Sequence, residues 1–223
     1  RDGLRHSMAQ RVCGQVRRTV SDVSVTVATS KSQVSAIRNQ LGDAIDICVE
    51  PCRRDTFPAI ALVSAYLHDV KGVGRDEAVA VCPVDPYVED AYFASVRRLA
   101  QLAADGAANL MLMGIEPTYP SEKYGYIIPQ DKAEVSRVLS FREKPEEAAA
   151  KRYIAQGALW NSGVFAYRLG YVLTRADALL GCADYGTLFS TYDRLDKISF
   201  DYAVAEREKN IGVLRYAGAW KDL

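Results

Sequence analysis

Short apolar runs alternate with amphipathic stretches along the first half of the chain. Four runs rich in apolar and β-branched side chains have the length of a strand: residues 23–28, 44–49, 77–84 and 109–115. Three stretches between them repeat apolar side chains at helical spacing: residues 30–41, 56–70 and 89–104. This alternation predicts an α/β fold with a largely parallel sheet and right-handed crossovers.

The pattern changes after Pro117, where residues 118–129 are rich in Tyr, Pro and Gly and predict an irregular excursion over the sheet. The remaining predicted elements are strands at 135–145, 158–169 and 211–216, and helices at 146–156 and 199–210. We expect one continuous domain over residues 1–223. Its fold class is α/β, with a Rossmann-like, mostly parallel mixed sheet flanked by helices and a smaller lobe at residues 117–180.

Composition narrows the possible functions. The 223 residues include 28 basic and 28 acidic side chains, and this zero net charge argues against a general nucleic-acid binder. No apolar run approaches the length of a membrane span. The five cysteines are scattered and only two histidines are present, so reduced thiols are favoured over a zinc site or a disulfide framework. We therefore expect a cytoplasmic protein without nucleic-acid or membrane partners.

Carboxylates follow several of the predicted strands. Ligands of an open parallel sheet bind beyond the carboxyl ends of its strands, so these residues are expected at one rim. They are Glu50, Asp85, Glu143 with its neighbour Lys144, and Asp222. A single carboxylate in such a position is usually a helix cap or a loop residue, but four of them favour a binding site.

The segment EPCRRDTFPAI, residues 50–60, concentrates charge before a predicted helix. Asp55 or Thr56 could cap that helix, and Pro58 fits its first turn. A cap needs only one such group. The guanidiniums of Arg53 and Arg54 therefore indicate that something anionic docks there.

The chain resembles the sugar-1-phosphate nucleotidylyltransferases, most closely the mannose-1-phosphate guanylyltransferases. The matching segments run in family order and cover most of the chain: EPCRRDTFPAIAL, PVDPYVED, GIEPTYPSEKYGYI, FREKPEEA, LWNSGVFAYR and ISFDYAVAE, followed by GAWKDL. The resemblance implies the nucleotide-diphospho-sugar transferase fold. It also implies that GTP and mannose 1-phosphate react to give GDP-mannose and pyrophosphate.

By this resemblance, Asp85 and Asp222 are catalytic carboxylates that hold Mg²⁺, the expected cofactor. Oxygen ligands suit this cation, which neutralises phosphate charge during the transfer. Lys144 is the third catalytic residue and meets the sugar phosphate as a point charge. Asp85 could instead be a turn residue before Pro86, and Asp222 a loop residue.

The resemblance assigns the nucleotide to Glu50, Arg53, Arg54 and Thr56. Guanine presents two adjacent donors on one edge, and a carboxylate at position 50 can accept both. Uracil and thymine present one donor between two carbonyl groups, which a carboxylate would repel. The alternative for Glu50 is pairing with one of the arginines. Asp55 departs from the family pattern, and we expect it to cap the helix or pair with an arginine.

The sugar-binding lobe at residues 117–180 carries the implied sugar contacts: Gly125, Tyr126, Glu143 and Asn161. The Gly125 backbone lies against the hexose in this interpretation, Glu143 accepts from its hydroxyls and Asn161 provides a second polar clamp. The YGY segment could instead be a tight turn with aromatic packing. The WNSG segment could be a bend in a strand.

The glycine-rich loop of the family, with its arginine and a Pro-Lys downstream, is absent from these 223 residues. We expect a further strand and loop before Arg1 in the parent protein, and poor activity without them. Two alternatives stay open: a uridylyl- or thymidylyltransferase, and a non-catalytic regulatory homologue. A homodimer is one arrangement that the sequence leaves open.

Overall fold

The computed structural model describes residues 6–43 and 45–221. Its α-helices are α1 (Met8–Thr19), α2 (Val34–Leu41), α3 (Thr56–Asp69), α4 (Asp90–Ala104), α5 (Glu147–Ala155), α6 (Leu169–Leu180) and α7 (Tyr185–Thr191). Shorter helical turns are η1 (Lys31–Gln33), η2 (Tyr192–Arg194) and the π-helical η3 (Asp201–Ala205). The strands are β1 (Thr26–Ser30), β2 (Asp46–Glu50), β3 (Ala78–Val81), β4 (Tyr87–Val88), β5 (Leu110–Ile115), β6 (Tyr126–Pro129), β7 (Val135–Arg142), β8 (Leu159–Arg168), β9 (Ile211–Tyr216) and β10 (Trp220–Lys221).

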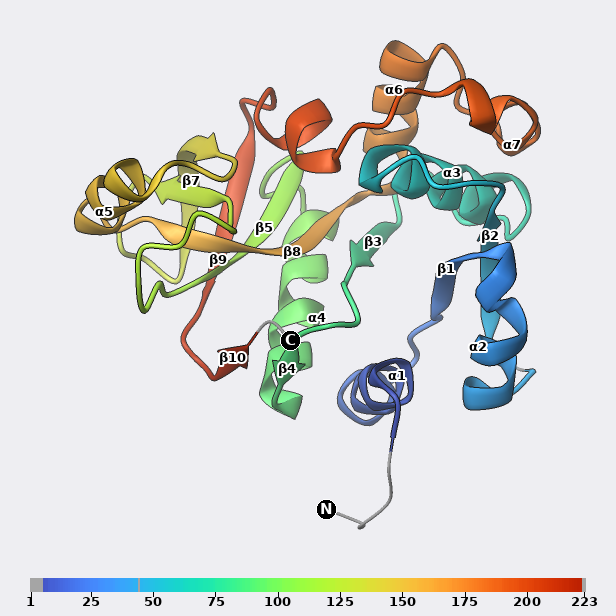
Figure 1. Cartoon of the computed structure of the whole chain (residues 1–223), viewed down its shortest axis with the longest axis horizontal. Helices are drawn as coiled ribbons and strands as arrows, with labels where there is room; N and C mark the ends of the chain where they lie inside the picture. Colours follow the sequence, from blue (N-terminus) through green and yellow to red (C-terminus); the bar gives the residue numbers. More distant parts are fainter. Residues whose placement is uncertain (1–5, 44, 222–223) are drawn as a thin grey trace.

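The largest sheet of the described residues has six strands in the order β3-β8-β5-β9-β7-β6. Because β6 also pairs with β8, the strands β5, β9, β7, β6 and β8 close into a ring (Figure 1). Two small sheets accompany it, β1 with β2 and β4 with β10. The α/β class with a central sheet and flanking helices agrees with the sequence-based expectation.

Helices cover both faces of the large sheet, and strand β5 shows why. Met111 and Met113 belong to the apolar cluster that includes the buried side of α4. Leu110 and Leu112 belong to the opposite cluster, which includes residues of α3, α6 and η3. Successive side chains of a strand point to opposite faces, so a continuous apolar run is what a strand buried on both faces requires.

The expected predominance of parallel pairing is wrong for the described residues. Only β1–β2 and β5–β9 are parallel there, and the other pairings are antiparallel. Strand β8 runs between β3 and β5 in the opposite direction. A buried antiparallel strand has the same apolar pattern as a buried parallel one, so the pattern carried no information on direction.

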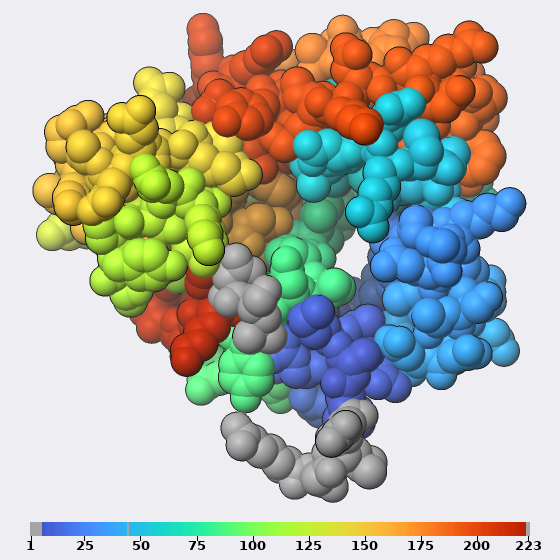
Figure 2. Space-filling model, in the orientation of Figure 1, coloured from blue at the N-terminus to red at the C-terminus, as the bar shows by residue number. Residues whose placement is uncertain are grey.

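Strands β1 and β3 are edge strands: in the described part of the chain, β1 pairs only with β2, and β3 only with β8. Figure 2 shows an opening at the centre of this face, bordered by blue segments of the N-terminal region, the cyan chain near the start of α3 and the green chain that follows β3. The strand expected before Arg1 remains a prediction. Among the described residues, no helix is long and apolar enough to cross a membrane.

Candidate active site

Helix α3 begins at the charged segment, and Asp55 is its N-cap. The Asp55 carboxylate accepts a hydrogen bond from the backbone N–H of Thr56 at 2.7 Å, and its backbone has a positive φ of 71°. A carboxylate there also interacts favourably with the positive end of the helix dipole. Pro58 lies in the first turn. The expectation that Asp55 serves as a cap is therefore confirmed.

Glu50 ends strand β2 and is held by a tyrosine. Its Oε2 accepts a hydrogen bond of 2.9 Å from the hydroxyl of Tyr192, a fully buried side chain. Arg54 donates to the backbone carbonyls of Tyr192, at 3.2 Å, and Asp193. In the described part of the chain neither arginine pairs with Glu50, and Arg53 is exposed. Burial, followed by the charge of Glu50, raises the pKa of the Tyr192 phenol.

The chain from Tyr192 to Asp201, here called the bridging segment, crosses from the end of α7 to η3 over the start of α3 (Figure 1). The Thr56 hydroxyl accepts from the Phe200 N–H at 2.8 Å, and the Phe57 N–H donates to the Ile198 carbonyl at 3.1 Å. Together with the hydrogen bond from Tyr192 to Glu50, these bonds fix the bridging segment to the end of β2 and to the start of α3.

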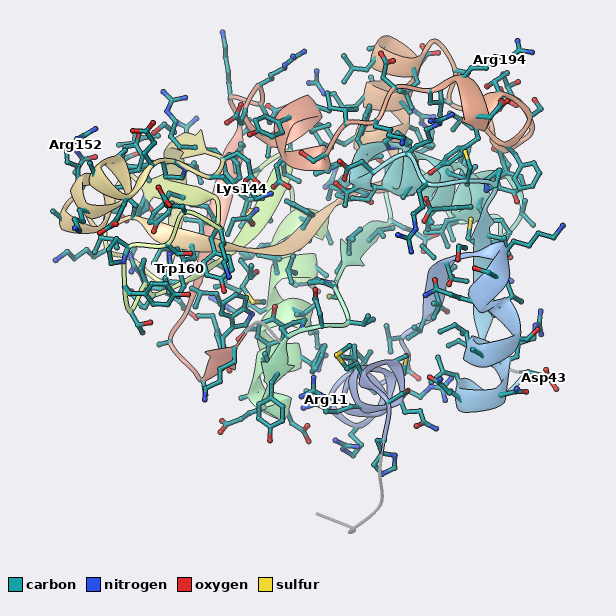
Figure 3. The ribbon with its side chains drawn as sticks, in the orientation of Figure 1. Arg11, Asp43, Lys144, Arg152, Trp160 and Arg194 are labelled. Carbon is teal, nitrogen blue, oxygen red and sulfur yellow. The ribbon has the colours of Figure 1, made fainter. Side chains whose placement is uncertain are left out.

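The predicted sugar residues Glu143 and Lys144 follow strand β7. The Glu143 side chain is only 7% exposed, and its Oε1 lies 3.1 Å from the Lys144 Nζ. Its Oε2 is buried and has no hydrogen-bond partner among the described residues. The Lys144 backbone has a φ of 41°, a conformation costly for a residue with a side chain. Figure 3 shows Lys144 on the inner side of its lobe, whereas Arg152 of α5 lies at the outer edge.

Gly125 lies directly against the Glu143 carboxylate. A Cβ atom at this glycine would be 2.6 Å from Glu143 Oε2 and 2.9 Å from Phe141 Cζ, so no side chain fits. The Gly125 carbonyl accepts from the Asn161 N–H at 2.8 Å. Tyr126 requires a correction: it is fully buried and its hydroxyl bonds to Trp160 and Ser121, so its side chain serves packing rather than sugar contact.

Asp201, the last residue of the bridging segment, lies against Asn161. The Asn161 Nδ2 donates to Asp201 Oδ1 at 2.8 Å, while the Asn161 Oδ1 accepts from the Gly163 N–H at 3.2 Å. Burial raises the pKa of the Asp201 carboxyl from 3.8 to about 7, and the charge of Glu143 adds to this. The motif ISFDYAVAE contains this residue, but its position beside the sugar residues was not predicted.

Asp85 lies in the loop between β3 and β4 and is exposed. Strand β4 pairs with β10, and Lys221 lies opposite Tyr87, two residues beyond Asp85. Asp222 follows Lys221 in the sequence but lies outside the described residues. The pairing thus brings the chain that precedes Asp222 beside the chain that follows Asp85.

Two further contacts connect this loop to the sugar residues. Gly163, in the bend of β8, has a φ of 73°, and a Cβ atom there would lie 3.7 Å from Pro83 Cγ. The Trp220 ring packs against Tyr124, the neighbour of Gly125, with ring centroids 5.4 Å apart. The loop that carries Asp85 and strand β10 therefore both lie beside segments that carry the predicted sugar residues.

A magnesium ion is implied by the resemblance, and the donor chemistry fits it. The described residues contain no group of three or more His, Cys, Asp or Glu that could hold a metal. Mg²⁺ usually takes one or two carboxylates and completes its shell with water and substrate phosphates. The exposed Asp85 carboxylate meets the requirement for a hard oxygen ligand.

The five cysteines are free. Burial raises the pKa of the Cys48 and Cys82 thiols to about 12, so neither thiol is a nucleophile near neutral pH.

The raised pKa of Asp201 predicts a pH effect on stability. The folded state binds this proton more tightly than the unfolded chain, so the contribution of Asp201 is most favourable below pH 4 and is lost as pH rises to about 7. The difference amounts to about 4 kcal/mol at most. Urea unfolding of wild type and Asp201→Asn over this range should show a free-energy difference that changes with pH. A constant difference would contradict the prediction.

Comparison with known proteins assigns the chain to a family. The family model described as nucleotidyl transferase matches residues 5–222. The chain belongs to the nucleotidyl transferase family. Within this family it is 34% identical over 199 residues to the alginate biosynthesis protein AlgA of Pseudomonas aeruginosa, a match that covers 79% of this chain and 40% of AlgA. It is 33% identical over 208 residues to the mannose-1-phosphate guanylyltransferase of Escherichia coli K12, covering 80% of this chain and 42% of that protein.

Among nucleotidyl transferase structures, the chain is similar to a crystal structure described as mannose-1-phosphate geranyltransferase from Thermus thermophilus. The TM-score is 0.83 at 28% identity, and the match covers 96% of this chain and 65% of that one. The matched regions thus span less than half of the two curated relatives above. The resemblance seen in the sequence motifs is confirmed.

Proposed function

We propose that the full-length protein transfers a guanylyl group from GTP to mannose 1-phosphate, giving GDP-mannose and pyrophosphate. The observation that carries this proposal is the hydrogen bonding of the Glu50 carboxylate. Its carboxylate stands at the end of β2, held by Tyr192 and unpaired with the adjacent arginines. An acceptor-only group in this position favours guanine over uracil and thymine. The relatives named as mannose-1-phosphate guanylyltransferases support the same reaction.

The transfer is an attack of the sugar phosphate oxygen on the α-phosphorus, in line with the leaving pyrophosphate, and it depends on alignment and charge neutralisation. Glu50 orients the base, the exposed Arg53 contacts phosphate, and Thr56 at the start of α3 contributes a hydroxyl to the nucleotide side. Arg54 holds the bridging segment through its carbonyl bonds. Asp85 and Asp222 are the residues that would hold Mg²⁺, whose chemistry is to neutralise phosphate charge.

Residues 117–180 contain the side chains and backbone that would contact the sugar phosphate. The hexose packs against the Gly125 backbone. The Glu143 Oε2, which has no partner among the described residues, accepts hydrogen bonds from the hydroxyl groups of the hexose. Asn161 adds an amide donor. Lys144 places its ammonium at the sugar phosphate, and its hydrogen bond to Glu143 raises the pKa of that ammonium, which keeps it charged.

Pyrophosphate release by the full-length protein, with Mg²⁺ and mannose 1-phosphate, tests the proposal. GTP should be used in preference to UTP and dTTP. Preference for UTP or dTTP would favour the related uridylyl- or thymidylyltransferases. Absence of turnover with every nucleotide, despite binding, would favour the non-catalytic homologue.

Replacement of Glu50 by Gln should reduce base discrimination. An amide offers one acceptor and one donor, so one guanine donor loses its partner, and kcat/KM for GTP should fall about 30-fold. The value for UTP should stay constant or rise. Glu77→Gln, at the amino end of β3, is the matched control and should behave as wild type. An unchanged GTP/UTP ratio in Glu50→Gln would exclude a base-reading role.

A further inference from the structure

Both polar atoms of the Asn161 amide have protein partners. The oxygen accepts from the Gly163 N–H, and the nitrogen gives one of its two hydrogens to Asp201. Rotating the amide by 180° would set its oxygen against the Asp201 oxygen and its nitrogen against an N–H donor. Both contacts would then be repulsive, so Asp201 and the Gly163 backbone together hold one amide orientation.

The remaining polar atoms form a complementary pair. Asn161 keeps one Nδ2 hydrogen, and Glu143 keeps the buried Oε2 that has no partner among the described residues. The two side chains flank Gly125: a Cβ atom there would lie 2.6 Å from Glu143 Oε2 and 3.4 Å from Asn161 Cβ, so glycine is what lets them stand this close. A donor and an acceptor in this arrangement match two adjacent hydroxyl groups.

We propose that Asp201 is a positioning residue of the sugar site, which fixes Asn161 as the donor and leaves Glu143 as the acceptor for adjacent hydroxyls of a hexose 1-phosphate. The inference rests on the proposed function and adds to it a residue that touches no substrate. Asp201 acts only through the orientation of the Asn161 amide.

The fold holds Asp201 firmly in this place. The preceding residue, Phe200, is fully buried and its N–H bonds to the Thr56 hydroxyl. Asp201 begins the π-helical turn η3, and the last three residues of that turn, Ala203, Val204 and Ala205, are buried. Single π-helical turns are frequent at functional sites, where they place a side chain that a regular helix would not.

The charged groups that face Asp201 are those at the end of β7. Glu143 raises the pKa of the carboxyl and Lys144 lowers it, while the Asn161 amide of β8 is neutral. Helix α3, which packs against the same segment, contributes Thr56 and Phe57, neither of which titrates. Protonation weakens the preference of the carboxyl for the Asn161 donor, so sugar binding should weaken as pH falls through about 7.

Kinetics of the full-length protein with mannose 1-phosphate and GTP varied in turn, from pH 6 to 8, test the inference. In Asp201→Asn, position 201 can present either an amide oxygen or an amide nitrogen to Asn161 and no longer fixes its orientation, so KM for the sugar phosphate should rise about 10-fold, with kcat and KM for GTP within about 3-fold of wild type. The pH step in the sugar-phosphate KM should disappear. Asp184→Asn, an exposed helix cap that an amide can also provide, is the matched control.

A reciprocal exchange separates positioning from stability. Combining Asp201→Asn with Asn161→Asp again gives a donor–acceptor bond of fixed direction, now from position 201 to position 161, but puts an acceptor where the ligand needs a donor. The melting temperature should recover while the sugar-phosphate KM stays high. An unchanged KM in Asp201→Asn, or recovery of KM in the double variant, would overturn the inference.

The outcomes distinguish the inference from the proposed function. If the wild type prefers UTP to GTP, the proposed function fails, and the sugar-phosphate KM of the Asp201 variants still decides the inference. If Asp201→Asn does not fold, the wild-type pH profile decides it, and a sugar-phosphate KM that is constant from pH 6 to 8 overturns it. If the wild type binds no hexose 1-phosphate by calorimetry, the inference is overturned as well.

Discussion

Replacing Asp85 with Asn is expected to lower kcat of the full-length protein about 10³-fold, because a neutral amide is a poor ligand for a divalent cation. The stability of the fold should change little. Asp85 is exposed, and no hydrogen bond or ion pair joins it to the other described residues. Pyrophosphate release at saturating GTP and mannose 1-phosphate measures the first effect, and thermal unfolding measures the second.

The Mg²⁺ dependence distinguishes a ligand from a general active-site charge. Asp85→Asn should need a much higher Mg²⁺ concentration for half-maximal rate, and Asp85→Glu should recover part of the activity. Asp76→Asn is the matched control, since Asp76 is also exposed but lies before the amino end of β3. If Asp85→Asn keeps more than a tenth of wild-type activity, the residue is not a metal ligand and the proposed role for Asp222 loses its partner.

The local structure could be predicted well from the sequence, because apolar runs and caps act over short distances. The runs at 109–115 and 211–216 became β5 and β9, and the segment from Asp55 gave the helix cap. Residues 126–129 became β6, although they belong to the Tyr-, Pro- and Gly-rich segment 118–129 that indicated irregular chain. Pairing with β7 and β8 stabilises that strand, and such long-range contacts leave little trace in local composition.

The strand pattern alone indicated candidate site residues only where strands end, whereas Gly125 and Asn161 came from the family resemblance. Glu50 and Glu143 were found from the strand ends. Tyr192 and Asp201 were not, because they reach the site from the bridging segment after α7. One signal was present for Asp201: a lone carboxylate within the largely apolar ISFDYAVA run is costly to bury without a partner. The sequence could indicate that a partner was required, but not that the partner is Asn161.

The bridging segment also connects the two halves of the site. At one end Tyr192 bonds to Glu50, and at the other Asp201 bonds to Asn161. Between them, Phe200 bonds to Thr56 at the start of α3. A shift of the nucleotide side of the site would therefore move groups that are hydrogen-bonded to the sugar side.

Gly125→Ala should lower kcat/KM for the sugar phosphate by at least about 10²-fold, since the added methyl group displaces the Glu143 carboxylate from its position. The added methyl group would lie 2.6 Å from Glu143 Oε2, so the carboxylate must move from its present position. Phe141, at 2.9 Å, blocks the other side. Overpacking of this kind also costs about 1–3 kcal/mol of stability. Steady-state kinetics and urea unfolding measure the two effects.

A second change should separate the two effects. Glu143→Asp in the Gly125→Ala background shortens the displaced side chain by one methylene, which relieves the contact with the carboxylate but not that with Phe141, and should restore part of the lost stability. Activity should not return, because the shortened carboxylate no longer reaches the hydroxyl that Oε2 accepts from. Gly186→Ala, where the added methyl would meet only an ordinary contact at 3.6 Å, controls for the substitution itself. Full activity in Gly125→Ala would show that the hexose does not lie against this glycine, and the sugar site would have to be placed elsewhere.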